Sequence, residues 1–268
     1  MTASVWRRFS SRDDPGVVST EQSDRSRAVA FVFGMSVLVI IPAAGAGIRM
    51  GGGTPKQFLS LEGVPIFVHT LRKFTAASAI DEIFLALRAE DRERAAKDID
   101  REHFAKPVRL VPGGATRQET VARALAEAPE KTELVVIHDA VRPFIELDLI
   151  QRVVEAARKD GAAILGIPSV DSVKQVERQT VLGTIPRERI VLAQTPQAFR
   201  YNIIQEAFTR AAADGFNGTD ESSLVERLGH PVTVLMGSDR NIKITKPSDL
   251  PLARLFIAQE REQSKAEV

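Results

Sequence analysis

From residue 37 onward, short apolar and β-branched runs alternate with longer stretches of helical periodicity. This alternation predicts an α/β fold with a mostly parallel sheet covered by helices on both faces. Because the crossovers are right-handed, the strand carboxyl ends, and with them a ligand site, should share one edge. We expect strands at residues 37–43, 82–88, 107–114, 133–140 and 162–169, and helices at 65–76, 91–104, 115–128 and 147–161.

The rhythm changes at residues 169–199, which contain β-branched residues and prolines but no helical stripe. We interpret this stretch as an antiparallel excursion, with a protruding β-hairpin arm at about 169–190. The pattern then returns to two helices, a strand and a last helix, at residues 201–215, 220–229, 232–237 and 248–262. No internal repeat or linker interrupts residues 35–268, so we expect a single domain that carries the arm.

The first 34 residues are rich in Ser, Arg and Asp and show little periodicity, so we expect a disordered tail, or an extension upstream of a true start at Met35. The whole chain has 268 residues, a net charge of +1 and no cysteine. The absence of cysteine excludes disulfides and thiolate metal sites and suits the reducing cytoplasm. No apolar run reaches the roughly 20 residues of a membrane helix. An anionic ligand must therefore be met by local charge.

The loop that follows the first predicted strand, IPAAGAGIRMGGGTPKQFL (41–59), carries the strongest functional signal. Its many glycines let the backbone approach a polyphosphate, and successive amides form an anion-binding concavity. Arg49 and Lys56 add two cations to the same loop. The pattern favours a phosphate-binding loop, and its main alternative is a flexible turn with solvated charges.

Two common phosphate-binding motifs fit this loop poorly. A dinucleotide fingerprint requires a helix that begins at once and an acidic residue about 20 positions later. Here Thr54 and Pro55 continue the loop, and the second strand ends only near Arg88. A P-loop requires Gly-Lys-Ser/Thr, whereas Lys56 follows a proline and precedes Gln57.

Other charged and polar groups follow later strands. GGATRQETV follows the third strand, and VVIHDAVRPFI ends the fourth with Asp139. An Asp at a strand's carboxyl end can hold Mg²⁺ on a triphosphate or can simply cap a turn. Asp220 can likewise cap a helix. We interpret the histidines as packing residues and assign no histidine ligand.

Nucleotidyl transfer uses such groups, because negative charge builds on the α-phosphate oxygens and on the leaving pyrophosphate. At residues 42–59 the chain resembles the 2-C-methyl-D-erythritol 4-phosphate cytidylyltransferase family, whose loop reads PAAGxGxRM…PKQ(F/Y)L. The motifs HDAxRPF, TPQ and NIK(I/V)T follow in family order. This resemblance implies a Rossmann-like nucleotidyltransferase that uses CTP in the non-mevalonate isoprenoid pathway.

The resemblance also implies roles for individual residues, with Thr120 standing where the family usually has Ser and Ser172 where it commonly has Thr. Catalytic roles are implied for Arg49, Lys56 and Lys243. Nucleotide contacts are implied for Pro42, Ala43, Ala44, Gly45, Gly47, Gly114, Arg117, Thr120 and Asp139. Contacts to the acceptor substrate are implied for Arg142, Ser172, Arg187, Asp220 and Lys243. Asp139 is the implied Mg²⁺ ligand.

The expected reaction is transfer of the cytidylyl group of CTP to 2-C-methyl-D-erythritol 4-phosphate, with release of pyrophosphate. The resemblance further implies a cytoplasmic homodimer with interlocking arms, and Arg187 serving the acceptor site across the dimer interface. A ribitol-5-phosphate cytidylyltransferase and a non-catalytic nucleotide-binding protein remain the alternatives. No partnership with nucleic acid or membrane is expected.

Overall fold

The computed structural model describes residues 36–45 and 54–266. They form two compact units: Pro168–Leu192, and a body comprising Ser36–Ile167 and the chain from Ala193 onward. Residues 1–34, for which we expect a tail or an upstream extension, lie outside the described part.

A seven-stranded sheet forms the centre of the body, in the order β11-β7-β10-β6-β1-β4-β5. Its members are β1 (Ser36–Pro42), β4 (Glu82–Leu87), β5 (Val108–Pro112), β6 (Thr132–Ile137), β7 (Ala162–Pro168), β10 (Val191–Arg200) and β11 (Thr233–Met236). β1 pairs in parallel with both β4 and β6, β4 with β5, and β11 with β7. β10 pairs antiparallel to β6, with Gln197 opposite Ile137. The predicted α/β fold with a mostly parallel sheet is confirmed.

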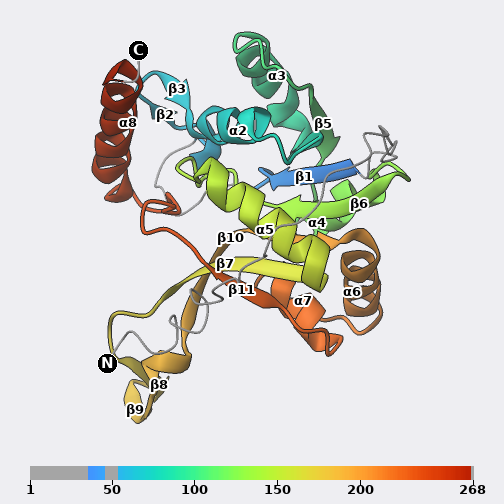
Figure 1. Cartoon of the computed structure of the whole chain (residues 1–268), viewed down its shortest axis with the longest axis vertical. Helices are drawn as coiled ribbons and strands as arrows, with labels where there is room; N and C mark the ends of the chain where they lie inside the picture. The colour runs from blue at the N-terminus through green and yellow to red at the C-terminus, as the bar shows by residue number, and fades with distance from the viewer. Residues whose placement is uncertain (1–35, 46–53, 267–268) are drawn as a thin grey trace, which may run out of the picture. The chain divides into compact units, whose positions relative to one another are not determined.

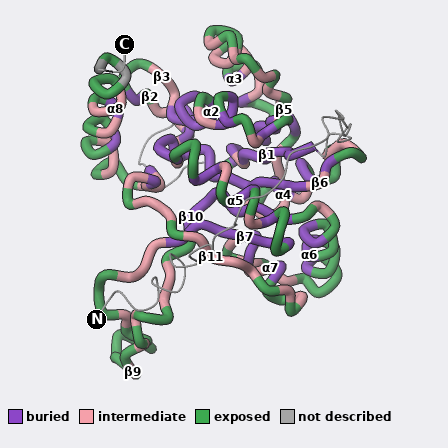
Figure 2. The backbone as a smooth tube through the Cα atoms, in the orientation of Figure 1, coloured by how far each residue is buried: buried purple, intermediate pink, exposed green. Residues whose placement is uncertain are grey.

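Helices cover both faces of this sheet (Figure 1). They are α2 (Ile66–Ala76), α3 (Arg92–Asp100), α4 (Arg117–Ala126), α5 (Leu147–Asp160), α6 (Tyr201–Ala213), α7 (Glu221–Arg227) and α8 (Asp249–Ala266). Along β1, Val37, Val39 and Ile41 pack with α2, α3 and α5, whereas Leu38 and Ile40 pack with α4, α6 and α7. Both faces of β1 are buried (Figure 2), which explains why residues 37–41 are all apolar.

A smaller apolar cluster joins α8 to the short hairpin of β2 (Ser60–Leu61) and β3 (Val64–Pro65). Leu61, Phe144, Ile244 and Ile257 are among its buried members. Ile244 belongs to the NIKIT segment, so this cluster anchors the chain on which Lys243 lies. None of the described helices is both long and apolar enough to cross a bilayer.

The predicted β-hairpin is present and consists of β8 (Val173–Glu177) and β9 (Thr180–Ile185), followed by the single 3₁₀ turn η4 (Arg187–Arg189). The expectation that residues 169–199 form one excursion needs a correction. The second part of that stretch is β10, which belongs to the central sheet. The expected helix at 91–104 is also shorter, because it begins as the 3₁₀ turn η3 (Ala89–Asp91) and ends at Asp100.

Candidate active site

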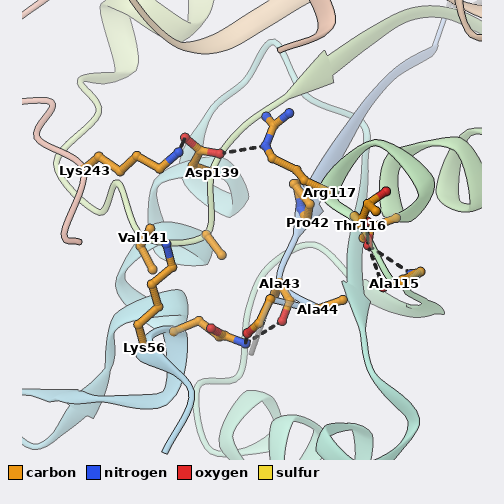
Figure 3. A pocket seen from close by; sticks show the side chains of 15 residues that line it. Pro42, Ala43, Ala44, Lys56, Ala115, Thr116, Arg117, Asp139, Val141 and Lys243 are labelled. Carbon is orange, nitrogen blue, oxygen red and sulfur yellow. Dashed lines mark hydrogen bonds and ion pairs between the residues drawn. The ribbon is translucent and has the colours of Figure 1, made fainter. Parts of the chain in front are cut away.

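A pocket of about 220 Å³ lies in the body, where the segments following β1, β5 and β6 come together. These three strands belong to the parallel part of the sheet, in which β4 lies between β1 and β5, so their carboxyl ends lie at the same edge. The pocket is lined by Pro42, Ala43, Ala44, Gly45, Lys56, Gln57, Gly114, Ala115, Thr116, Arg117, Thr120, Asp139, Ala140, Val141 and Lys243. Charged groups face it from opposite walls, as Figure 3 shows for Lys56, Arg117 and Lys243.

The wall that follows β1 is held by a glutamine. Ala43 continues the β1 ladder, because its N–H donates to the carbonyl of Ala86 at 2.8 Å. The buried Gln57 amide donates to the carbonyl oxygens of Ala43 at 2.6 Å and Gly45 at 3.1 Å. Gln57 lies in the 3₁₀ turn η2 (Lys56–Phe58), so the same contacts fix where Lys56 enters the pocket. Gly47 and Arg49 lie outside the described residues.

The wall that follows β5 is a tight turn into α4. The Thr116 side chain caps α4 by accepting from the N–H of Glu119, and the Glu119 carboxylate accepts from the N–H of Ala115 at 2.7 Å. The buried Thr120 hydroxyl accepts from the N–H of Gly114 at 3.0 Å and donates to the carbonyl of Thr116 at 2.8 Å. In this structure the Thr120 hydroxyl thus shapes the turn that lines the pocket.

Asp139 follows β6 and is the most highly connected charge of the site. Its carboxylate contacts Lys243 at 2.9 Å, Arg117 at 3.2 Å and Arg142 at 3.3 Å. Burial by itself would raise the pKa of Asp139, but the three cations outweigh it and hold that pKa well below its ordinary value. Asp139 is therefore a carboxylate at neutral pH, and it brings together Arg142 from its own segment with Arg117 and Lys243 from distant parts of the chain.

A buried network supports Asp139 from behind. The His138 ring packs against Phe74, and its Nε2 lies 3.0 Å from the carbonyl of Arg142. A carbonyl only accepts, so Nε2 carries the proton and Nδ1 accepts from the Thr195 hydroxyl at 3.2 Å. Burial lowers the pKa of His138 to about 4, so the ring is neutral. The same hydroxyl accepts from the N–H of Asp139 at 3.1 Å, which fixes the backbone at the end of β6.

Four residues with implied contacts to the acceptor substrate are not among those that line the pocket. Arg142 is mostly buried, and it donates to the carbonyl of Asn241 at 2.7 Å in addition to contacting Asp139. Asp220 is the N-cap of α7, where its carboxylate accepts from the N–H of Ser223 at 3.1 Å. Arg187 lies in the hairpin unit and donates to the carbonyl of Val170 at 2.7 Å. Ser172, in the same unit, is exposed.

The structure adds four residues to those inferred from the sequence: Gln57, Gly113, Glu221 and Asn241. Gln57 holds the β1 loop, and a Cβ on Gly113 would lie 2.4 Å from the Cβ of Ala44. Glu221 pairs with Arg117 at 2.6 Å, and Asn241 is fully buried and donates to the carbonyl of Thr195 at 2.8 Å. Gln57 and Asn241 lie within the motifs PKQ and NIK, and membership of these motifs is the sequence signal that could have identified them. Nothing in the local sequence connects Glu221 to Arg117.

Comparison with known proteins agrees with this geometry. The family model described as "IspD: 2-C-methyl-D-erythritol 4-phosphate cytidylyltransferase" matches residues 37–259. The enzyme of that name from Solibacter usitatus is 52% identical over 241 residues, which span 86% of this chain and 99% of the relative. Its counterpart from Acidobacterium capsulatum is 51% identical over 235 residues, spanning 84% of this chain and 98% of the relative.

Solved structures show the same likeness. The crystal structure of 4-diphosphocytidyl-2C-methyl-D-erythritol synthase from Anaerococcus prevotii superposes with a TM-score of 0.75 at 31% identity, covering 83% of this chain and 96% of that one. The 2-C-methyl-D-erythritol 4-phosphate cytidylyltransferase of Thermus thermophilus gives a TM-score of 0.67 at 36% identity, covering 83% and 98%. The matches extend from β1 to α8 and include every segment that lines the pocket, so the chain belongs to the 2-C-methyl-D-erythritol 4-phosphate cytidylyltransferase family, the enzymes that join CTP to this alcohol phosphate.

Proposed function

We propose that the pocket binds the triphosphate of CTP, and that Lys56 and Lys243 stabilise charge while the α-phosphorus is displaced. The observation that supports this most directly is the convergence of both lysines, with Arg117 and Asp139, on one cavity at the carboxyl end of parallel strands. Arg49, outside the described residues, belongs in the same role. The lining residues Pro42, Ala43, Ala44, Gly45 and Gly114 have small apolar side chains or none, which leaves room for the nucleotide.

The proposed step is an in-line displacement. A phosphate oxygen of 2-C-methyl-D-erythritol 4-phosphate forms a bond to the α-phosphorus of CTP, and the bond from that phosphorus to the bridging oxygen of the β-phosphate breaks. The electron pair of the broken bond leaves with pyrophosphate. The attacking phosphate is already anionic, so the protein needs no general base and contributes positioning and electrostatic stabilisation.

We assign Mg²⁺ to the bound nucleotide rather than to a site made by the protein alone. Within residues 36–45 and 54–266, no group of three or more acidic or histidine side chains is arranged to hold a metal. Among the described residues, Asp139 is the only carboxylate that lines the pocket. One carboxylate fits an ion whose remaining ligands are phosphate oxygens and waters. Mg²⁺ bound in this way neutralises charge on the triphosphate, and Asp139 would be its protein ligand.

We further propose that the enzyme works in the cytoplasm as a homodimer whose arms complete the acceptor sites. Arg187 and Ser172 would contact the acceptor phosphate from the partner subunit, and Arg142 and Asp220 would support the acceptor side within the chain. The hairpin supports this proposal, because Val170, Val176, Val181 and Leu182 each leave more than half of their surface exposed. The absence of cysteine suits the reducing cytoplasm.

The test of the catalytic assignment is Lys56→Ala. Loss of one positioned charge should lower kcat by roughly a hundredfold to a thousandfold, with a much smaller change in the KM of the acceptor. Lys97→Ala is the matched control, because Lys97 is exposed on α3 and forms an ion pair with Glu93 at 2.7 Å. Pyrophosphate release measured with both CTP and the acceptor at saturating concentrations reports kcat directly. Turnover of the Lys56→Ala enzyme near that of the control would overturn the assignment.

A further inference from the structure

The carboxylate of Glu221 does not line the pocket, but it accepts a hydrogen bond from Arg117, which does. Glu221 is the first residue of α7, and only 1% of its surface is exposed. Its Oε1 accepts from Nη1 of Arg117 at 2.6 Å, and its Oε2 has no hydrogen-bond partner among the described residues. Burial raises the pKa of Glu221, and the Arg117 guanidinium opposes that rise. The contact with Arg117 is therefore the main interaction that offsets the desolvation of this buried carboxylate.

Arg117 is held by two carboxylates at once. Nη1 donates to Glu221, while Nε donates to Asp139 at 3.2 Å. Burial alone would lower the pKa of Arg117, but the two carboxylates hold it above its ordinary value. About a third of the side chain remains exposed, and Arg117 is one of the residues that line the pocket. Two donors fixed at different acceptors leave the planar guanidinium with one orientation.

Glu221 is itself held firmly from the central sheet. The Gln197 amide on β10 donates to the Asp220 carboxylate at 2.7 Å, and its carbonyl accepts from the N–H of Ser222 at 3.1 Å. Asp220 also caps the helix through Ser223. The residues on both sides of Glu221 are thus tied down, so its carboxylate can act as a fixed point for Arg117.

We infer that Glu221 is a positioning residue for CTP binding, which acts by fixing the Arg117 guanidinium through their direct contact in the pocket wall. This inference rests on the proposed binding of CTP in the pocket. A buried ion pair contributes little net stability, because desolvation offsets its attraction. Its consequence is instead the orientation of Arg117, and so removing Glu221 should alter nucleotide binding more than it alters the fold.

The first measurement uses Glu221→Gln, which keeps the shape of the side chain and removes its charge. KM for CTP and the Kd for CTP by titration calorimetry should rise roughly tenfold, the scale of a lost hydrogen bond between charged groups. KM for the acceptor should change less than about twofold. Arg227→Gln is the matched control, since Arg227 lies at the other end of α7 and pairs with Asp214 at 2.9 Å. It should leave both KM values unchanged.

The second measurement repeats Glu221→Gln in an Arg117→Ala background. If Glu221 acts only through Arg117, the substitution should have no further effect on the Kd of CTP there, although it raises that Kd in the parent enzyme. Equal rises in both backgrounds, or no rise in the parent, would overturn the inference. An Arg117→Ala enzyme that binds CTP normally would instead refute the proposed role of Arg117, which keeps the two failures distinct.

Stability is followed in parallel, so that a folding defect is not mistaken for a binding defect. Glu221→Asp, which keeps the charge but shortens the reach, should show the same selective rise in KM for CTP. Thermal unfolding of each variant in the absence of nucleotide shows whether the body is intact. Comparable losses of affinity for CTP and for the acceptor in both variants would indicate general disruption and would overturn the inference.

Discussion

At the scale of single residues, Asp139 has the largest effect on its surroundings. It is 6% exposed and is surrounded by one lysine and two arginines that come from α4, the segment after β6, and the segment before α8. Its removal would leave these cations facing one another across a partly buried wall. A buried charge that loses its partner is strongly destabilising, more so than the pair is stabilising.

Asp139→Asn should therefore lower the free energy of unfolding by about 3 kcal/mol at neutral pH, measured by urea denaturation. The pKa of Asp139 is depressed in the folded state, so its stabilisation is complete above the ordinary carboxyl value of 3.8 and is lost as the pH falls through the lower folded value. The stability difference between the parent and Asp139→Asn should be constant from pH 7 to 5 and should shrink below 3.8. A difference that grows in acid would contradict this account.

At the scale of elements, the turn from β5 into α4 shows how backbone and pocket are joined. Gly113 donates its N–H to the carbonyl of Leu87 at 2.7 Å, which brings the turn against the end of β4. A Cβ at this position would lie 2.4 Å from that of Ala44 and 3.2 Å from the carbonyl oxygen of Leu87. Ala44 lines the pocket, so a clash here would be transmitted to the nucleotide wall.

Gly113→Ala should destabilise the body by about 1–3 kcal/mol, the usual cost of overpacking, and should raise KM for CTP. Gly183→Ala is the control for stability, because a Cβ on Gly183 would have nothing within 4 Å. Its unfolding midpoint should match that of the parent or exceed it slightly. If Gly113→Ala unfolds at the parental midpoint and binds CTP normally, the turn is not as tightly packed as the structure shows.

The strands and helices of the parallel half follow from the sequence because each carries its own periodicity and its own turn signals. The sequence of β10 does not predict a central strand, because Pro196 lies within it and proline is rare in central strands. Three polar residues, Gln194, Thr195 and Gln197, are buried there as well. Only tertiary contacts explain why these residues are buried, because each forms a hydrogen bond with a residue from another segment of the chain. The contact between Glu221 and Arg117 is of the same kind, because it joins residues 104 positions apart.

At the scale of the whole molecule, the hairpin unit is notable for the apolar side chains that it leaves exposed. Val176 and Val181 are register partners in β8 and β9, so their side chains share one face of the hairpin, and both leave more than half of their surface exposed. Leu182 is the next residue along β9, so it lies on the opposite face and is 56% exposed. An isolated two-stranded hairpin is marginally stable in water. Apolar side chains on both of its faces favour a partner that covers them.

We therefore expect the protein to be a dimer in light scattering at micromolar concentration, and Val181→Glu to convert it to a monomer. Gln179→Glu adds the same charge in the exposed turn between β8 and β9 and should remain dimeric. Because the CTP pocket is made within the body, the Val181→Glu monomer should keep its Kd for CTP. Its KM for the acceptor should rise steeply, since Arg187 would no longer be supplied by a partner. A monomeric parent, or a Val181→Glu monomer with a normal KM for the acceptor, would contradict the proposed role of the arm.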